Sequence, residues 1–261
     1  MAQITSPVLL DIFVQPLCPK LILVPINDTG HKISVANFIR LPENVFDMQV
    51  HAFNNSPNDS NVYLINGCVV VDVGMNARST LEQIKQYTDP KNVELIVLTH
   101  NHYDHIGAVL EVASACNAKI AMHADDARVL NDDYATAAAM FGRKTPSFIP
   151  DIIYGNGVNE TVCAGNDIFE VIHTPGHTKG CICLYNKASK VLFSGDTVFP
   201  SGSFGRYDLS GGNGKQLIES LKHLANLDVD IMYPGHGAVT DCDTNSQIKM
   251  SLQMAMATVR C

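Results

Sequence analysis

The stretch VELIVLTHNHYDHIG (residues 93–107) constrains the fold more than any other part of the chain. Its first seven residues are almost continuously apolar, which predicts a short, fully buried β-strand. The strand runs directly into His100, His102, Asp104 and His105. From Asp104 onward apolar residues recur at helical spacing: Ile106, Val109, Leu110 and Ala113. The chain must therefore place a buried strand, a histidine-rich turn and a helix in immediate succession.

Metal binding explains why so many histidines lie together. Neighbouring imidazoles repel each other once protonated, and a metal cation can take the place of the protons. His100 and His102 are two residues apart on an extended segment, so they point to the same side. Asp104 and His105 lie at the start of the helix and turn the other way, so one loop can face two metal positions. A solvated polar turn would have no use for three histidines.

Three further places match this turn. His177 lies in HTPGHTKG, Asp196 in SGDTVF and His236 in YPGHG, each beside a strand-like run and a glycine. Strand ends along one edge of a sheet converge in space, so these residues are expected to meet the first four. Imidazole and carboxylate ligands suit Zn²⁺ best here, with Fe²⁺ or Mn²⁺ as alternatives. Ordinary structural roles are expected for five further histidines: His31, His51, His123, His173 and His223. His173 closes a strand near His177 and is also compatible with a supporting role at the site.

The rest of the pattern predicts a layered α/β domain with two sheets. Two apolar runs around Asn66-Gly67 (residues 61–74) predict a β-hairpin. A helix is expected over 79–88, opened by a Ser79/Glu82 capping box. The remaining expectations are strands at 119–123, 168–173, 181–185, 190–194 and 229–237, helices at 125–141 and 211–227, and a loop at 142–160.

Composition narrows the functional class. The chain has 261 residues and a net charge of −8, which disfavours a nucleic-acid-binding surface. The apolar N-terminal stretch is interrupted by Asp11, Pro16, Pro19 and Lys20, so neither a membrane span nor a signal peptide is expected. The eight scattered cysteines contain no CxxC pair, and no disulfide framework is expected. A cytoplasmic enzyme acting on a small molecule is the default expectation. The N-terminal segment is also compatible with a homodimer interface.

At this point the sequence resembles the metallo-β-lactamase fold superfamily. The match rests on His100, His102, Asp104, His105, His177, Asp196 and His236, together with Asp72 in VVVDVG. It implies a four-layer αβ/βα sandwich with a dinuclear site at one edge of the sheets. In family terms His100, His102 and His177 hold one ion, and Asp104, His105 and His236 hold the other. Asp196 bridges the two ions, and Asp72 supports the site from behind.

Within the superfamily the sequence looks closest to the glyoxalase II-like group. The interval of 19 residues from His177 to Asp196 fits, as does GDTVFPSGSFGRYD, in which Arg206 is a candidate for binding an anionic substrate. A surface salt bridge is an equally good interpretation of Arg206. Glyoxalase II proper continues into a helical glutathione-binding domain, whereas 25 residues follow His236 here, so the resemblance leaves the thiol carrier open. The resemblance does not explain residues 1–45, which are expected to form an N-terminal extension of short strands, and the catalytic domain is expected over 46–261.

The expected activity is therefore that of a dinuclear metal-dependent hydrolase. A hydroxide bridging two divalent ions would attack a thioester or a related ester or lactone, with Asp104 as the catalytic residue that orients it. One alternative is an iron oxygenase resembling persulfide dioxygenase, with a single Fe²⁺ on His100, His177 and Asp196. The others are a phosphodiesterase or nuclease, and a non-catalytic metal-binding scaffold.

Overall fold

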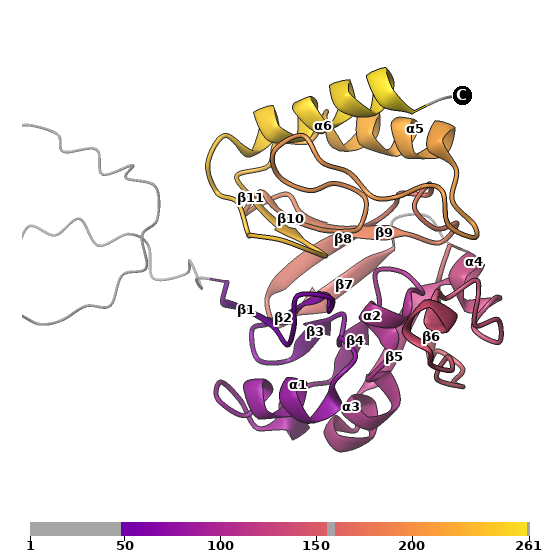
Figure 1. The fold of residues 1–261 in the computed structure, drawn as a ribbon. Helices are drawn as coiled ribbons and strands as arrows, with labels where there is room; N and C mark the ends of the chain where they lie inside the picture. Colours follow the sequence, from indigo (N-terminus) through magenta and orange to yellow (C-terminus); the bar gives the residue numbers. More distant parts are fainter. Residues whose placement is uncertain (1–47, 156–159, 260–261) are drawn as a thin grey trace, which may run out of the picture. The chain divides into compact units, whose positions relative to one another are not determined.

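A computed structural model of the chain describes residues 48–155 and 160–259. The expected extension of short strands over residues 1–45 lies outside the described residues. The described part contains two β-sheets, each covered by helices on its outer face (Figure 1). Within it, no helix is both long enough and apolar enough to cross a membrane.

The first sheet has the order β1-β2-β3-β4-β5-β6. It begins as an antiparallel meander and becomes parallel from β3 onward. The hairpin between β2 and β3 turns at Asn66 (φ 49°) and Gly67 (φ 68°), which confirms the turn predicted from this pair. The strands are β1 (Val50–Asn54), β2 (Asn61–Ile65), β3 (Val69–Val71), β4 (Leu95–Val97), β5 (Lys119–His123) and β6 (Ile152–Tyr154).

The second sheet has the order β11-β10-β9-β8-β7. It is antiparallel except for the β10–β11 pair, which is parallel. A parallel pair aligns the carboxyl ends of its strands, so the segments that follow β10 and β11 lie next to each other. The strands are β7 (Thr161–Ala164), β8 (Asp167–His173), β9 (Ile182–Asn186), β10 (Val191–Gly195) and β11 (Ile231–Pro234).

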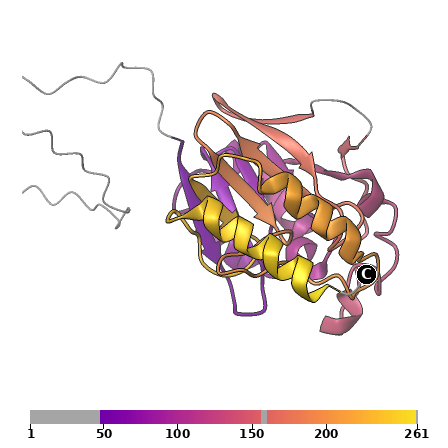
Figure 2. The same ribbon diagram turned by 90° about the horizontal axis from the view of Figure 1, so that it is seen from above.

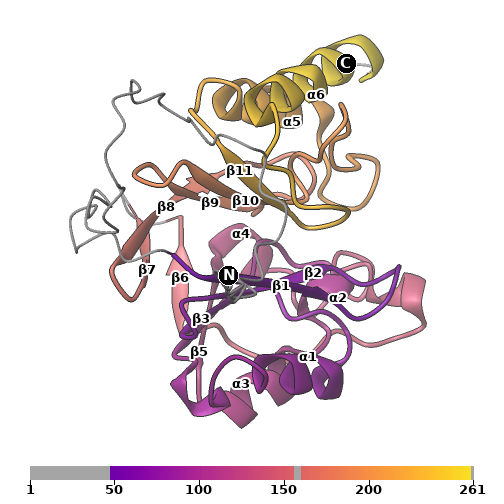
Figure 3. The ribbon, with the colours of Figure 1, turned by 90° about the vertical axis from the view of Figure 1, so that its left-hand side faces the viewer.

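The layers follow from three separate apolar clusters. The inner faces of the two sheets meet around Tyr63, Phe169 and Phe193. A second cluster joins the first sheet to α1 (Ala77–Ile84) and α3 (Val109–Cys116). A third joins the second sheet to α5 (Gly214–Leu224) and α6 (Thr244–Thr258), which lie side by side in Figure 2. The predicted αβ/βα sandwich is confirmed, and Figure 3 shows both helical layers at its outer faces.

Several boundaries differ from the sequence-based expectations. The helix expected from Ser79 begins at Ala77, because Asn76 caps it by accepting a hydrogen bond from the Ser79 backbone N–H. The helix expected over 125–141 is wrong, since only α4 (Ala124–Ala127) and the 3₁₀ turn η2 (Ala138–Phe141) form there. The helix expected from Asp104 to Cys116 is two helices, α2 (Tyr103–Ile106) and α3. Strands β1, β6 and β7 and helix α6 were not predicted, and β6 interrupts the loop that was expected over 142–160.

Candidate metal centre

All seven candidate ligands converge at one edge of the two sheets. The first four lie in the segment that leaves β4 and enters α2: His100, His102, Asp104 and His105. The other three come from the second sheet, where they follow β8, β10 and β11: His177, Asp196 and His236. The Gly195-Asp196 segment and the Gly235-His236 segment are adjacent, because Gly235 donates a backbone hydrogen bond of 2.8 Å to Gly195. Residues distant in the sequence are therefore assembled across the sandwich.

His100, His102 and His177 form the first group of candidate ligands. One ligand atom from each lies within 4.8 Å of the other two. Their ring centroids are 4.5–4.8 Å apart. All three side chains are buried, and the Nε2 atom of each lacks a hydrogen-bond partner among the described residues. Three unpartnered nitrogens that face a common point are suited to a cation, since leaving them empty costs the desolvation energy of each.

Asp104, His105 and His236 form the second group. The His236 Nε2 atom lies 3.1 Å from Asp104 Oδ2 and 3.3 Å from His105 Nε2. His105 Nε2 is 3.8 Å from Asp104 Oδ2. Zinc ligands about 2.0–2.1 Å from a tetrahedral ion lie roughly 3.4 Å from one another, so these separations suit a shared ion.

Asp196 lies between the two groups. Its Oδ2 atom is 3.5 Å from Nε2 of His177 in the first group and 3.5 Å from Nε2 of His236 in the second. Its Oδ1 atom is 3.4 Å from His105 Nε2 and has no hydrogen-bond partner within residues 48–155 and 160–259. Gly235 makes this approach feasible, because a Cβ atom at that position would lie 2.1 Å from Asp196 Oδ1.

The protonation states at the centre suit metal binding. Burial and the neighbouring His177 lower the pKa of His102 to about 3, although two nearby carboxylates oppose the shift. Burial also lowers the pKa of His100 and of His177. A metal ligand must be a neutral imidazole or an ionised carboxylate, so these three histidines are already in the required form near neutral pH.

The carboxylates create the complementary charge. Burial alone would raise the pKa of Asp196, but His105, His236 and His177 outweigh it and lower the pKa. The same balance lowers the pKa of Asp104. Against the effect of burial, the surrounding acids raise the pKa of His105 well above its ordinary value. These acids favour positive charge beside His105, and a divalent ion would supply it.

Hydrogen bonds from behind hold the imidazole rings in position. His105 Nδ1 lies 2.8 Å from Asp72 Oδ2. His100 Nδ1 lies 3.1 Å from the Thr99 hydroxyl, which itself donates to Asp72 Oδ2. The third ring is that of His177, whose Nδ1 lies 2.6 Å from the carbonyl oxygen of Arg206. A hydrogen bond at Nδ1 fixes the tautomer that leaves Nε2 free for a metal. Asp72 thus contacts the ring of His105, and the contacts of Thr99 and of the Arg206 carbonyl were not expected from the sequence.

The Arg206 side chain points to solvent and forms an ion pair. Its guanidinium makes two hydrogen bonds of 2.9 Å to the carboxylate of Asp208. Both side chains are more than half exposed. The salt bridge that was one of the two interpretations of Arg206 is therefore present. Binding of an anionic substrate by the guanidinium would require this ion pair with Asp208 to break.

The other histidines in the described ranges lie apart from the centre. His173 is within 2.8 Å of the Lys179 carbonyl oxygen and stacks on His123, with ring centroids 4.0 Å apart and an interplanar angle of 13°. His123, His173 and Asp125 also bring ligand atoms within 4.8 Å of one another, but two nearly parallel rings are poorly arranged to direct in-plane lone pairs at one ion. Within the described residues no hydrogen bond joins His173 to any of the seven ligands, so the alternative of a supporting role gains no contact that favours it.

The buried carboxylate of Asp126 was also missed by sequence reasoning. It accepts hydrogen bonds from the backbone N–H of Asn101, between two ligands, and from the hydroxyl of Thr178, next to a third. A single acid in a segment expected to be helical carries no spacing signal, so no pattern could have singled it out.

Comparison with known proteins agrees with this geometry. A family model described as "Metallo-beta-lactamase superfamily" matches residues 55–236, the range that holds all seven ligands. The chain is 31% identical over 174 residues to hydroxyacylglutathione hydrolase GloC of Haemophilus influenzae, covering 66% of this chain and 80% of that protein.

Two solved structures share the fold at 28% sequence identity. The crystal structure of BLEG-1 B3 metallo-beta-lactamase superposes with a TM-score of 0.67, covering 78% of this chain and 97% of that one. The crystal structure of TTHA1623 in a di-iron-bound form gives a TM-score of 0.64, with coverage of 78% and 98%.

Proposed function

This chain belongs to the metallo-beta-lactamase superfamily of metal-dependent hydrolases, and from that premise we propose that it hydrolyses a thioester or a related ester or lactone. We propose two divalent ions at the centre, preferably Zn²⁺, with Fe²⁺ or Mn²⁺ as alternatives. His100, His102 and His177 would hold one ion, and Asp104, His105 and His236 the other, with Asp196 between them. Residues 46–261 would form the catalytic domain.

One observation carries the proposal. Four buried atoms have no hydrogen-bond partner within the described structure and lie among these ligands: His100 Nε2, His102 Nε2, His177 Nε2 and Asp196 Oδ1. Buried polar atoms are almost always paired, so four unpaired ones in one place favour a group other than the protein chain at this point. Nitrogen and carboxylate donors in this number suit zinc or iron.

When bound, the two ions would lower the pKa of a water molecule to about 7 and polarise the substrate carbonyl. The side chains around them supply the rest. Asp104, whose side chain is 15% exposed, would orient the attacking water and accept its proton. The hydrogen bonds at the Nδ1 atoms of His100, His105 and His177 keep their rings from rotating during the reaction.

The proposed substrate class rests on two supports. A relative that is 31% identical is named hydroxyacylglutathione hydrolase, which favours an acylated thiol. Arg206 lies beside His177 in the fold and carries an exposed guanidinium that could bind an anionic carrier group. A thiolate leaves without protonation, so a thioester needs little help from a general acid.

Metal analysis followed by a substrate panel tests the proposal. We expect about two metal ions per chain and turnover of thioesters or lactones above a phosphodiester control. His102→Ala and Asp196→Ala are each expected to reduce turnover more than about 100-fold, since losing even an outer partner of a ligand costs 10–100-fold. A matched control is His223→Ala, which changes a histidine outside the ligand set.

Two results would count against the proposal. Full activity in both ligand variants would show that hydrolysis does not depend on this centre. A single iron per chain with oxygen uptake would instead indicate an oxygenase that uses His100, His177 and Asp196.

A further inference from the structure

Asp126 is a buried acid whose two oxygens join segments from different sheets. It lies in the short helix α4 and is 1% exposed. Its Oδ2 atom accepts the Asn101 backbone N–H at 2.9 Å and the Thr178 hydroxyl at 2.7 Å. Its Oδ1 atom accepts the Gly180 backbone N–H at 2.7 Å. The carboxylate therefore accepts three hydrogen bonds at an almost fully buried position.

Each of these donors lies close to a candidate metal ligand. Asn101 separates His100 from His102, and Thr178 directly follows His177. These three histidines form the first group of ligands, although they come from two different sheets. We infer that Asp126 is a positioning residue that sets the spacing between the His100–His102 segment and the His177 loop (residues 174–181), and so tunes the affinity of the first metal position. This inference rests on the metal centre proposed above.

The His177 loop is shaped to receive this carboxylate. A Cβ atom at Gly180 would lie 2.7 Å from the Asp126 backbone nitrogen and from its Cγ, so a side chain there would push α4 away. Cys181 supports the other donor, because its Sγ lies 3.1 Å from the Thr178 hydroxyl and 3.4 Å from the Thr178 backbone nitrogen. Both residues of the loop that donate hydrogen bonds to Asp126, Thr178 and Gly180, are thus held in position by their surroundings.

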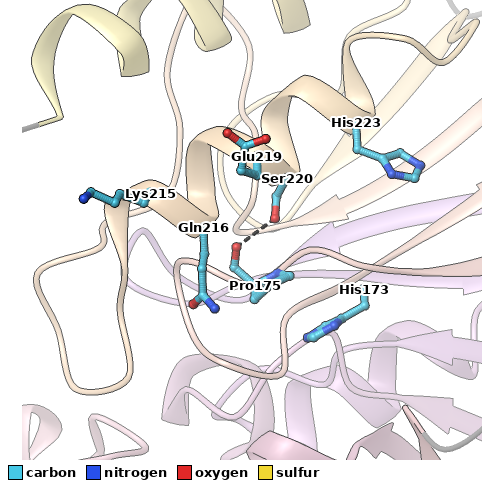
Figure 4. Close-up of a pocket in the computed structure, with 7 residues that line it drawn as sticks. All are labelled: His173, Pro175, Lys215, Gln216, Glu219, Ser220 and His223. Atoms are coloured by element: carbon cyan, nitrogen blue, oxygen red, sulfur yellow. Dashed lines mark hydrogen bonds between the residues drawn. The ribbon is translucent and has the colours of Figure 1, made fainter. Parts of the chain in front are cut away.

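Helix α5 holds the same loop from the opposite side. Ser220 donates a hydrogen bond of 2.8 Å from its hydroxyl to the Pro175 carbonyl oxygen, drawn as a dashed line in Figure 4. The Asn213 backbone N–H donates to Gly176 at 2.8 Å. These contacts attach the loop to the helical layer of its own sheet and do not reach the His100–His102 segment. Ser220→Ala is therefore a matched control, since it loosens the loop without touching the connection between the sheets.

The fold does not depend on Asp126 alone. The Ile182 backbone N–H donates to the Thr99 carbonyl oxygen at 2.9 Å, so a main-chain hydrogen bond already joins the two segments beside the carboxylate. Asp126→Asn should therefore fold with the sheets docked. Its amide group can accept at only one of two positions and presents an N–H₂ to a donor at the other, which disturbs the spacing locally.

The test compares Asp126→Asn, Thr178→Val and Ser220→Ala with the unmodified protein. We would measure Zn²⁺ affinity by competition with a chelator, and the visible spectrum of the Co²⁺-substituted protein. Asp126→Asn is expected to weaken the first Zn²⁺ site by about 10–100-fold and to shift the Co²⁺ bands, as outer partners of ligands typically do. Thr178→Val removes one of the three hydrogen-bond donors to Asp126 and should weaken Zn²⁺ affinity several-fold. Ser220→Ala should remain near the unmodified protein in affinity and in spectrum.

Amide hydrogen exchange of the metal-free protein provides a readout independent of the ion. Asn101 and Gly180 should exchange faster in Asp126→Asn than in Ser220→Ala. The inference fails if Asp126→Asn keeps full affinity and an unchanged Co²⁺ spectrum, or if Ser220→Ala loses as much affinity as Asp126→Asn. Should Asp126→Asn not fold, Thr178→Val decides by the same measures. An unmodified protein that binds no metal would refute the proposed function itself, and this inference with it.

Discussion

The Nδ1 atom of His105 lies 2.8 Å from Oδ2 of Asp72, and both side chains are buried. The same carboxylate accepts the Thr99 hydroxyl and the Thr99 backbone N–H, each at 2.8 Å. Because Thr99 also contacts His100, one acid orients a ligand of each proposed metal position. Asp72 has a φ of 55°, a left-handed conformation that Asn tolerates better than most residues.

Asp72→Asn is therefore expected to weaken metal binding while the backbone is kept. The amide cannot accept hydrogen bonds from Thr99 and from His105 at both of its terminal atoms, so at least one ligand loses its partner. We expect a loss of about 10–100-fold in Zn²⁺ affinity, measured by chelator competition. Asp151→Asn is the control, since Asp151 accepts a backbone hydrogen bond from Ile120 and contacts no ligand. Equal affinity in both variants would contradict this role.

Replacing Arg206 tests substrate recognition separately from metal binding. Its carbonyl, not its side chain, contacts His177, so Arg206→Met should leave metal content unchanged. If the guanidinium binds an anionic carrier, KM for an anionic thioester should rise several-fold with kcat nearly constant, and a neutral thioester should be unaffected. Asp208→Asn should lower KM for the anionic substrate, because it releases Arg206 from its ion pair. Unchanged KM values in Arg206→Met would show that the guanidinium does not bind the substrate and only forms the salt bridge with Asp208.

Asp126 should make stability depend on pH. Burial raises its pKa to about 6, although hydrogen bonds from Thr178, Gly180 and Asn101 oppose the shift. A carboxyl that binds its proton more tightly in the folded state contributes stability that is full below its unfolded pKa of about 4 and is lost as the pH rises through 6. The free energy of unfolding of the metal-free protein should therefore fall, relative to Asp126→Asn, between about pH 4 and 6. Denaturant titrations across this range measure it, and a constant difference would refute it.

Metal removal is expected to lower stability. A ligand that binds only the folded state at 1,000 times its Kd stabilises it by about 4 kcal/mol. For a domain of this size that corresponds to a Tm shift of roughly 8–16 °C, using about 2–4 °C per kcal/mol. Calorimetry with and without a chelator measures the shift. His102→Ala should show a smaller one, because it removes a buried ligand from the first group. The same Tm with and without chelator would argue against a folded-state metal centre.

Phe193 tests the core between the sheets independently of the metal. Its ring is fully buried and packs against Tyr63, Phe169 and Tyr233. Phe193→Ala should reduce the free energy of unfolding of the metal-free protein by about 3–5 kcal/mol, through lost burial and a cavity. Ile149→Ala, at a side chain that is 91% exposed, should change it by less than about 0.5 kcal/mol. Similar losses in the two variants would contradict the assigned core.

The sequence predicted best those elements whose own residues determine them. The Asn66-Gly67 pair sets its hairpin because both residues take positive φ, and the apolar run before His100 leaves β4 no alternative to burial. The helix expected over 125–141 failed for an equally local reason. The Asp132 carboxylate accepts the backbone N–H groups of Tyr134 and Ala135, and this turn competes with a helix.

The candidate site divides along the same line. The seven ligands carry a recognisable spacing at strand ends, so their convergence could be predicted. The supporting contacts could not be predicted, because they join segments that are distant in the chain and leave no periodic pattern in the sequence. They involve Thr99, Asp126 and the Arg206 carbonyl. Every residue has a backbone carbonyl, so the residue type at position 206 could not indicate that its carbonyl contacts His177.

Each of the two ligand groups combines residues that follow strands of the first sheet with residues that follow strands of the second. The order in which the chain is synthesised therefore determines when each metal position can be completed. Chains fold from the N-terminus as they leave the ribosome, so the segment from His100 to His105 emerges long before His177, Asp196 and His236. Until the second sheet has docked, the first sheet provides only an incomplete set of ligands for a cation. Metal occupancy would then record that the two halves have come together correctly, and an incomplete or misdocked chain would be recognisable by its empty centre.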